Sequence, residues 1–197
     1  MARLLACVVL GGLLCACSPP SVPTAIPGST GSPGPEPSAV TFGDGEHRVG
    51  VDVEPGTYRA FRPSTANPED FCYWERVAGF GGSDPELLGN SGGFGSRVVT
   101  IGPTDAGFIS EHCGTWTSDL SPVSGSVGDG VWIVGTDVQP GRYVSAGGLL
   151  CLWQRLSGFG GHGGELLEGG TTGEVTIGPA DVGFSSSHCG EWRPAAR

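Results

Sequence analysis

The sequence predicts an all-β protein made of two tandem, disulfide-stapled repeats, each a small antiparallel β-sandwich or barrel. Three observations support this prediction. The chain of 197 residues contains 37 glycines and 16 prolines, and no apolar run keeps the 3.6-residue period of a helix. Most of the chain after residue 40 is written twice, with a period of about 80 residues. Each copy carries two cysteines at matching positions.

The composition argues against two classes of protein. Acidic residues number 20 against 10 basic ones, which gives a net charge of −10, whereas a nucleic-acid-binding surface needs clustered lysine and arginine. Only 15% of the residues are charged, which is low for a helical bundle or a coiled coil. We therefore expect no nucleic acid among the partners.

Residues 1–16 are predicted to be an export signal. Arg3 supplies a positive start, and the apolar run 4–14 is too short to cross a bilayer as a helix. Leu14-Cys-Ala-Cys17 resembles the lipobox of bacterial lipoproteins. The resemblance implies cleavage before Cys17 and a diacylglyceryl group on its thiol, which suffices for a stable membrane anchor. An ordinary cleaved signal peptide with a chance cysteine is the alternative.

A Pro-, Ser- and Gly-rich spacer follows the lipidated cysteine, so that residues 17–40 form one segment. In 18–40, 17 of the 23 residues are Pro, Ser, Gly or Thr. Such a stretch cannot bury a core and favours a disordered, polyproline-like chain. We expect it to hold the folded part away from the membrane.

The folded part is one unit written twice. The first copy runs over 41–116 and the second over 126–192, with a linker at 117–125 and a tail at 193–197. The copies share several motifs: VGVDVEPGTY (49–58) with VGTDVQPGRY (134–143), CYWERVAGFGG (72–82) with CLWQRLSGFGG (151–161), VTIGPTDAGF (99–108) with VTIGPADVGF (175–184), and HCGTW (112–116) with HCGEW (188–192).

Each copy reads as a series of short strands. Runs rich in Val, Ile, Thr and aromatic residues alternate with Gly and Pro turns, which is typical of antiparallel sheets. The Pro-Gly pairs at 55–56 and 140–141 fit the central positions of a type II turn. In the first copy we expect strands near 46–51, 57–61, 71–77, 86–89, 96–101, 107–110 and 113–116, with equivalents in the second.

Four cysteines remain once the signal and the lipidated residue are set aside. In an exported chain they are expected to form disulfides, and four cysteines allow three connectivities. The duplication favours pairing within each copy, Cys72 with Cys113 and Cys151 with Cys189. Each bond would close a loop of about 40 residues and stabilise its repeat by about 4 kcal/mol.

A tryptophan and an arginine follow the first cysteine of each copy at alternate positions. Trp74 and Arg76, like Trp153 and Arg155, therefore share a strand face with that cysteine. The favoured interpretation is a core face on which Trp packs against the disulfide and Arg pairs with a carboxylate. A Trp–Arg ligand platform is the alternative. The candidate carboxylates recur in both copies: Asp52 and Asp137, and Asp105 and Asp181.

Phe80 and Phe159 each stand inside a glycine cluster, Gly-Phe-Gly-Gly. No lysine follows the cluster, so it does not resemble a phosphate-binding loop. We expect a loop with an aromatic tip, which either plugs its own domain or is offered to a partner. The second possibility makes both phenylalanines candidate binding residues.

No catalytic or metal-binding pattern appears in the sequence. The recurrent aspartates beside Gly or Pro are typical of turn-capping residues, and no calcium-loop run is present. His112 and His188 each precede a cysteine, but without the spacing of a zinc site. No nucleophile motif accompanies the serines. We expect no metal, no cofactor and no enzymatic activity.

The motifs VGxDxxPGxY, CxWxR, GFGG, VTIGPxDxGF and HCGxW together resemble a repeat of largely uncharacterised secreted proteins and lipoproteins of actinobacteria. The resemblance covers 41–116 and 126–192 and implies location and repeat architecture, without an activity. We expect an exported lipoprotein on the outer face of the cytoplasmic membrane, whose twin non-catalytic modules bind a wall glycan or an envelope protein with avidity. The alternatives are a passive structural surface protein and an envelope hydrolase with an unrecognised site.

Overall fold

The computed structural model describes residues 38–62, 67–82 and 84–196, which all belong to one compact unit, 38–197. The predicted export signal and Cys17 lie outside the described residues. Nowhere in those three ranges does a helix reach the length and apolarity needed to cross a membrane.

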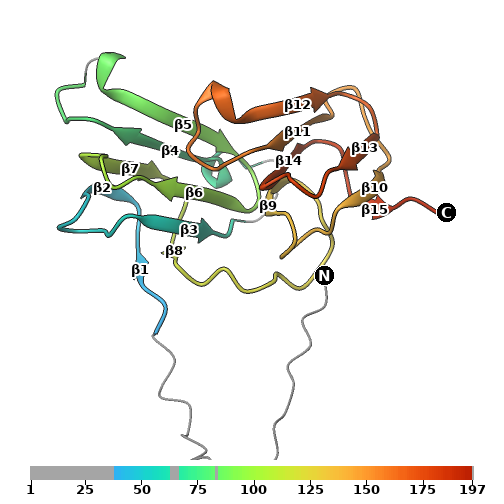
Figure 1. The fold of residues 1–197 in the computed structure, drawn as a ribbon. Helices are drawn as coiled ribbons and strands as arrows, with labels where there is room; N and C mark the ends of the chain where they lie inside the picture. The colour runs from blue at the N-terminus through green and yellow to red at the C-terminus, as the bar shows by residue number, and fades with distance from the viewer. Residues whose placement is uncertain (1–37, 63–66, 83, 197) are drawn as a thin grey trace, which may run out of the picture. The chain divides into compact units, whose positions relative to one another are not determined.

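The first repeat packs two antiparallel four-stranded sheets face to face (Figure 1). One sheet has the strand order β1-β8-β3-β6, and the other has the order β2-β7-β4-β5. The bounds are β1 (Thr41–Phe42), β2 (Gly45–Arg48), β3 (Gly56–Ala60), β4 (Cys72–Val77), β5 (Leu87–Gly93), β6 (Arg97–Ile101), β7 (Gly107–Glu111) and β8 (Trp116–Thr117).

The second repeat has the same plan with one strand fewer. Its sheets have the orders β13-β10-β15 and β12-β11-β14-β9. The bounds are β9 (Gly130–Ile133), β10 (Gly141–Val144), β11 (Leu152–Leu156), β12 (Leu166–Gly170), β13 (Glu174–Ile177), β14 (Gly183–Ser187) and β15 (Arg193–Pro194). Three short 3₁₀ helices complete the described elements: η1 (Pro68–Asp70), η2 (Asp84–Glu86) and η3 (Gly163–Glu165).

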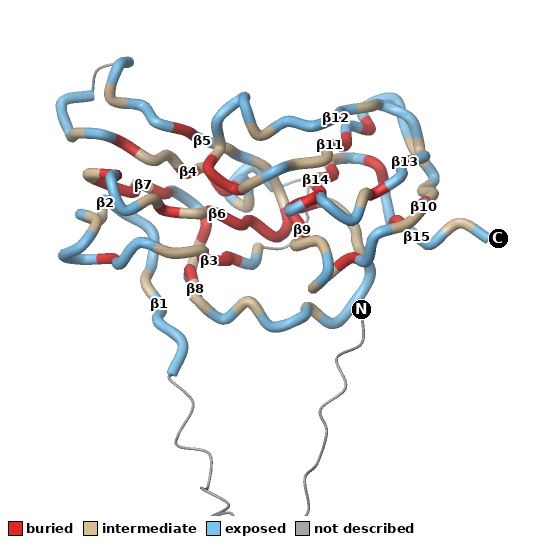
Figure 2. The backbone as a smooth tube through the Cα atoms, in the orientation of Figure 1, coloured by how far each residue is buried: buried red, intermediate tan, exposed pale blue. Residues whose placement is uncertain are grey.

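Each repeat has its own core, stapled by its own disulfide. The bonds join Cys72 to Cys113 and Cys151 to Cys189, which is the pairing that the duplication favoured. Figure 2 shows the buried residues along the middle of the strands. The first core contains Tyr58, Trp74, Val99, Ile101, Phe108 and Trp116, and the second contains their equivalents Tyr143, Trp153, Val175, Ile177, Phe184 and Trp192.

A third apolar cluster joins the two repeats. Val98 of β6 packs with Val131 of β9 and with Phe159, and Ile133 and Leu156 pack against them. Residues 96 and 130 form a parallel bridge between the repeats, and the Val131 amide donates to the Ser96 carbonyl at 2.7 Å. The repeats therefore share buried surface and pack as one body.

Two predicted strands are shorter than expected. The strand expected near 46–51 ends at Arg48, where the chain turns. Residues 113–116 were expected to be extended, but β8 begins only at Trp116. His112 and Gly114 have φ of 55° and 80°, so the chain turns tightly around Cys113. A non-glycine residue rarely adopts such a φ, although histidine tolerates it better than most. His188 has the same φ of 55° in the second repeat.

Candidate functional site

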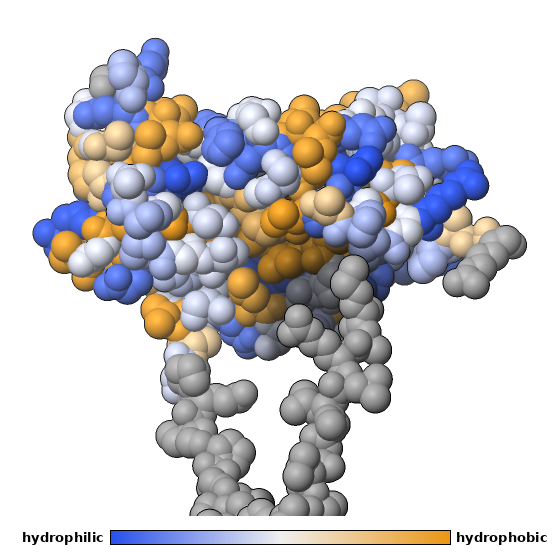
Figure 3. Space-filling view, viewed as in Figure 1, coloured by the Kyte–Doolittle hydropathy of each residue, from blue (hydrophilic) through white to orange (hydrophobic). Residues whose placement is uncertain are grey.

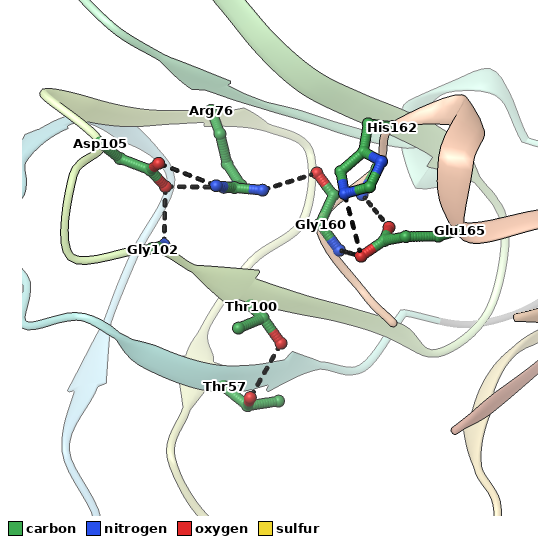
Figure 4. A network of polar contacts seen from close by, with 9 residues as sticks. Thr57, Arg76, Thr100, Gly102, Asp105, Gly160, His162 and Glu165 are labelled. Carbon is green, nitrogen blue, oxygen red and sulfur yellow. Dashed lines mark hydrogen bonds and ion pairs between the residues drawn. The ribbon is translucent and has the colours of Figure 1, made fainter. Parts of the chain in front are cut away.

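A loop of the second repeat is inserted against the edge of the first. We call residues 158–161 the Phe159 loop. The Thr100 amide of β6 donates to the Phe159 carbonyl at 2.9 Å, and the Asn90 amide of β5 donates to the Gly161 carbonyl at 3.1 Å. Arg76 Nη1 donates to the Gly160 carbonyl at 2.9 Å (Figure 4). Three hydrogen bonds thus fix the loop on strands of the other repeat.

Glu165 holds the Phe159 loop in shape from its own side. Its carboxylate accepts hydrogen bonds from the Gly160 and Gly161 amides at 2.8 and 2.9 Å. His162 Nε2 lies 3.5 Å from the same carboxylate (Figure 4). Gly161 has a φ of 74°, a conformation that favours glycine. The loop is therefore built by its own repeat and presented to the other.

A cleft of about 240 Å³ opens beside this contact, and both repeats line it. Apolar groups alternate with side-chain amides, hydroxyls and an imidazole. Lining side chains with hydrogen-bonding groups include Trp74, Asn90 and Ser91 of the first repeat and Gln154, His162 and Ser185 of the second. Figure 3 shows apolar surface over the first residues of β5 and β12, where the cleft-lining Leu166 and its neighbours are exposed.

Trp74 has a buried indole N–H without a hydrogen-bond partner. The side chain is 2% exposed and lines the cleft. Each of the other four tryptophans donates: Trp116 to Ser110, Trp132 to Gly128, Trp153 to Thr172 and Trp192 to Ser186. A buried donor left without an acceptor costs about 1–3 kcal/mol, so an acceptor that reached this N–H would be stabilising.

The tryptophan and arginine of each copy lie as the favoured interpretation expected, on a core face with the arginine paired to a carboxylate, rather than as an exposed Trp–Arg platform. Trp74 and Trp153 are buried in the two cores. Arg76 pairs with Asp105 at 2.6 Å, and Arg155 pairs with Asp181 at 2.6 Å. These are two of the carboxylates that the sequence had offered as partners.

In the two arginine–aspartate pairs, the pKa values of both arginines and of Asp181 are shifted. Hydrogen bonding to Asp105 raises the pKa of Arg76, and hydrogen bonding to Asp181 raises that of Arg155. The Arg155 hydrogen bonds lower the pKa of Asp181 below its usual range, with a further contribution from the Gly178 amide. Both aspartates also accept the amide of their own turn, which confirms the turn-capping interpretation.

Phe80 and Phe159 differ in exposure although their sequences match. Each ring lies over an equivalent glycine, so close that a Cβ on Gly107 or Gly183 would come within 2.5 Å of it. Phe159 is 6% exposed because the first repeat covers it, whereas Phe80 is 43% exposed. Phe159 therefore packs within its own repeat and also against Val98 of the first repeat.

A buried ion pair also crosses between the repeats. Arg59 Nη2 lies 2.5 Å from Asp137 Oδ2, and both side chains are 1% exposed. The equivalent Asp52 instead pairs with Arg48 on the surface of the first repeat. Sequence reasoning had treated the two aspartates as equivalent turn caps, so it missed the different role of Asp137.

The cleft itself could not be found by comparing the two copies. Gln154 replaces Glu75, and Asn90 corresponds to Gly169 in strand register. A comparison of the two copies identifies only residues that both repeats keep, so it could not identify cleft residues that differ between them. In the described ranges, no group of three or more His, Cys, Asp or Glu residues could hold a metal ion.

These features define a tandem β-sandwich protein with one disulfide in each repeat, a class typical of oxidising compartments. The chain belongs to the family of Rv1352-like extracellular domains, whose model matches it twice, over residues 39–117 and 125–193. Membership of an extracellular family supports an exported protein.

The chain is also similar to mycobacterial proteins. It is 29% identical over 124 residues to the uncharacterized protein Rv1352 of Mycobacterium tuberculosis and to the uncharacterized protein Mb1387 of Mycobacterium bovis. Each match covers 59% of this chain and 97% of the relative. No solved structure matches the chain significantly.

Proposed function

We propose that the protein is a membrane-anchored, non-catalytic binding protein of the cell envelope, and that the cleft between its repeats is the ligand site. The observation that carries this proposal is a cleft lined by both repeats, whose lining includes Trp74, a residue with a buried indole N–H that has no hydrogen-bond partner. Binding sites combine apolar walls with a few placed polar groups, and the cleft has both.

The size and chemistry of the cleft favour one unit of a wall glycan. About 240 Å³ is less than the ~300–1,000 Å³ of sites for drug-sized ligands, so a single sugar-sized group fits. The amides of Asn90 and Gln154 can donate and accept, which suits hydroxyl-rich ligands. A hydroxyl or carbonyl oxygen would satisfy the Trp74 N–H.

The test compares binding of soluble peptidoglycan glycan fragments by residues 38–197 and by two matched variants. Trp74→Phe removes the orphaned N–H and keeps an aromatic ring, so we expect weaker binding by about tenfold, the value of one hydrogen bond. Trp132→Phe, at a tryptophan that does not line the cleft, should bind as tightly as the parent. Equal binding by all three proteins would contradict a cleft site.

The anchor is part of the proposal and has a separate test. Lipidation of Cys17 would place the repeats on the outer face of the cytoplasmic membrane, with two acyl chains giving stable attachment. The full chain should partition into detergent, and Cys17→Ser should not. A Cys17→Ser protein that still carries lipid would contradict the anchor without affecting the cleft.

A further inference from the structure

The contact between the repeats is asymmetric. It uses a loop of the second repeat and a site on the first, whereas the equivalent loop of the first repeat and the equivalent site on the second remain outside it. The Phe159 loop of the second repeat occupies a site on the first that we call the β5–β6 socket. The first repeat carries an equivalent loop, residues 79–82, which we call the Phe80 loop, and the second carries an equivalent socket on β12 and β13. A contact of this head-to-tail kind can extend from chain to chain unless something stops it.

The Phe80 loop already has the conformation of the docked loop. Gly82 has a φ of 71°, close to the 74° of Gly161. A Cβ on Gly81 would meet the Glu86 carboxylate at 3.0 Å, just as a Cβ on Gly160 would meet that of Glu165. Because the loop is built before any partner arrives, docking would cost little conformational entropy.

The β5–β6 socket depends on a glycine, which leaves room for the loop, and on an apolar side chain. A Cβ on Gly89 would lie 2.1 Å from the Gly160 carbonyl oxygen, so any residue other than glycine would displace the Phe159 loop. Val98 is buried against Phe159. Arg76, which pairs with Gly89 in strand register, donates a hydrogen bond from Nη1 to the Gly160 carbonyl of the docked loop.

The second socket is closed at both of these positions. Glu168 is the register equivalent of Gly89, and its carboxylate accepts a hydrogen bond from Arg155 Nη1 at 2.6 Å. Glu174 stands where Val98 would be, exposed and paired with Arg142 at 2.9 Å. A docking loop would meet a clash at the first position, and at the second it would have to cover the charged Glu174, which pairs with Arg142.

We propose that the Phe80 loop is a docking element for another repeat of this same fold on a different chain. The matching socket has glycine at the position of Gly89 and an apolar residue at the position of Val98. Glu168 and Glu174 close the second socket of this chain and so prevent it from assembling head to tail with itself. The inference does not depend on the ligand proposed for the cleft.

The experiment opens the closed socket of one chain and offers it the Phe80 loop of another. The acceptor is residues 38–197 with Glu168→Gly, Glu174→Val and Phe80→Ala, which has an open socket and no aromatic loop. The probe is the parent 38–197, which has the loop and a closed socket. Light scattering at up to about 1 mM, the range of effective concentration within a short-linked chain, should show a one-to-one complex of doubled mass.

Two controls identify the contact. A parent with Phe80→Ala should give no complex with the acceptor. An acceptor with Glu168→Ala in place of Glu168→Gly keeps the Cβ and should also give none. A folded acceptor that leaves the parent monomeric, or a complex that survives Phe80→Ala in the parent, would overturn the proposal.

If the acceptor does not fold, the proposal is tested by closing the occupied β5–β6 socket instead of opening the closed one. Gly89→Glu places in the first socket the residue that closes the second, so the Phe159 loop should leave it. We expect hydrogen exchange of the Thr100 and Asn90 amides to rise at least tenfold. Unchanged protection of these amides would show that a glutamate does not close a socket, and the proposal would fail.

Discussion

At the scale of single residues, Trp74 and Trp153 are equivalent in sequence but differ in their hydrogen bonds. Trp153 Nε1 donates to the Thr172 carbonyl at 2.9 Å, whereas that of Trp74 has no partner. Trp153→Phe should therefore destabilise the folded protein by about 1 kcal/mol more than Trp74→Phe. Urea unfolding of residues 38–197 measures the difference, and equal losses would mean that the Trp74 N–H is not orphaned.

Asp181 gives a pH dependence whose sign follows from its lowered pKa. The carboxyl group binds protons less readily in the folded state than in the unfolded state, where its pKa is about 3.8. Its contribution to stability is complete above that value and is lost as the pH falls through the lower folded pKa. Asp181→Asn should cost about 1–3 kcal/mol at pH 7, and the gap to the parent should narrow below pH ~4. A gap that stays constant in acid would contradict the pairing with Arg155.

At the scale of elements, the two phenylalanine loops give a matched pair of substitutions. Phe159 is buried between the repeats, so Phe159→Ala should cost about 3–5 kcal/mol of the free energy of unfolding. Phe80 is 43% exposed and packs over Gly107 of its own repeat, so Phe80→Ala should cost less than half as much. Calorimetry of both variants checks this, and similar losses would contradict the asymmetric contact.

The elements that could be predicted from the sequence are those that both repeats share. Alternating apolar residues and Pro-Gly turns predicted β3, β4, β6 and β7 within a residue or two. The strand predicted near 86–89 is longer in the structure, where β5 has a polar, glycine-rich second half and extends to Gly93 as the partner of β4. Tertiary pairing here outweighs local β propensity.

The contact between the repeats could not be predicted for a related physical reason. Its determinants, Gly89 against Glu168 and Val98 against Glu174, are differences between the copies. Duplication makes shared residues visible and hides those by which one repeat differs from the other. The exposure of Phe80 and the burial of Phe159 likewise follow only from the packing of one copy on the other.

At the scale of the whole molecule, the Arg59–Asp137 pair tests whether the repeats unfold together. Asp137→Ala leaves Arg59 buried without its counter-charge, which typically costs about 3–5 kcal/mol. The equivalent change Asp52→Ala breaks only a surface pair with Arg48 and should cost far less. We expect calorimetry to show one transition for the parent and for Asp52→Ala, and a split or broadened one for Asp137→Ala. Identical traces for the two variants would contradict the coupling.

Mapping a bound glycan by NMR tests whether the cleft between the repeats is the ligand site. Soluble peptidoglycan glycan fragments are titrated into isotope-labelled residues 38–197, and the amide shifts are followed. We expect shifts that cluster at Asn90 of the first repeat and at Gln154 and Ser185 of the second, and that weaken with Trp74→Phe. Shifts that are absent, or that gather around Phe80 and leave the cleft unchanged, would contradict the account.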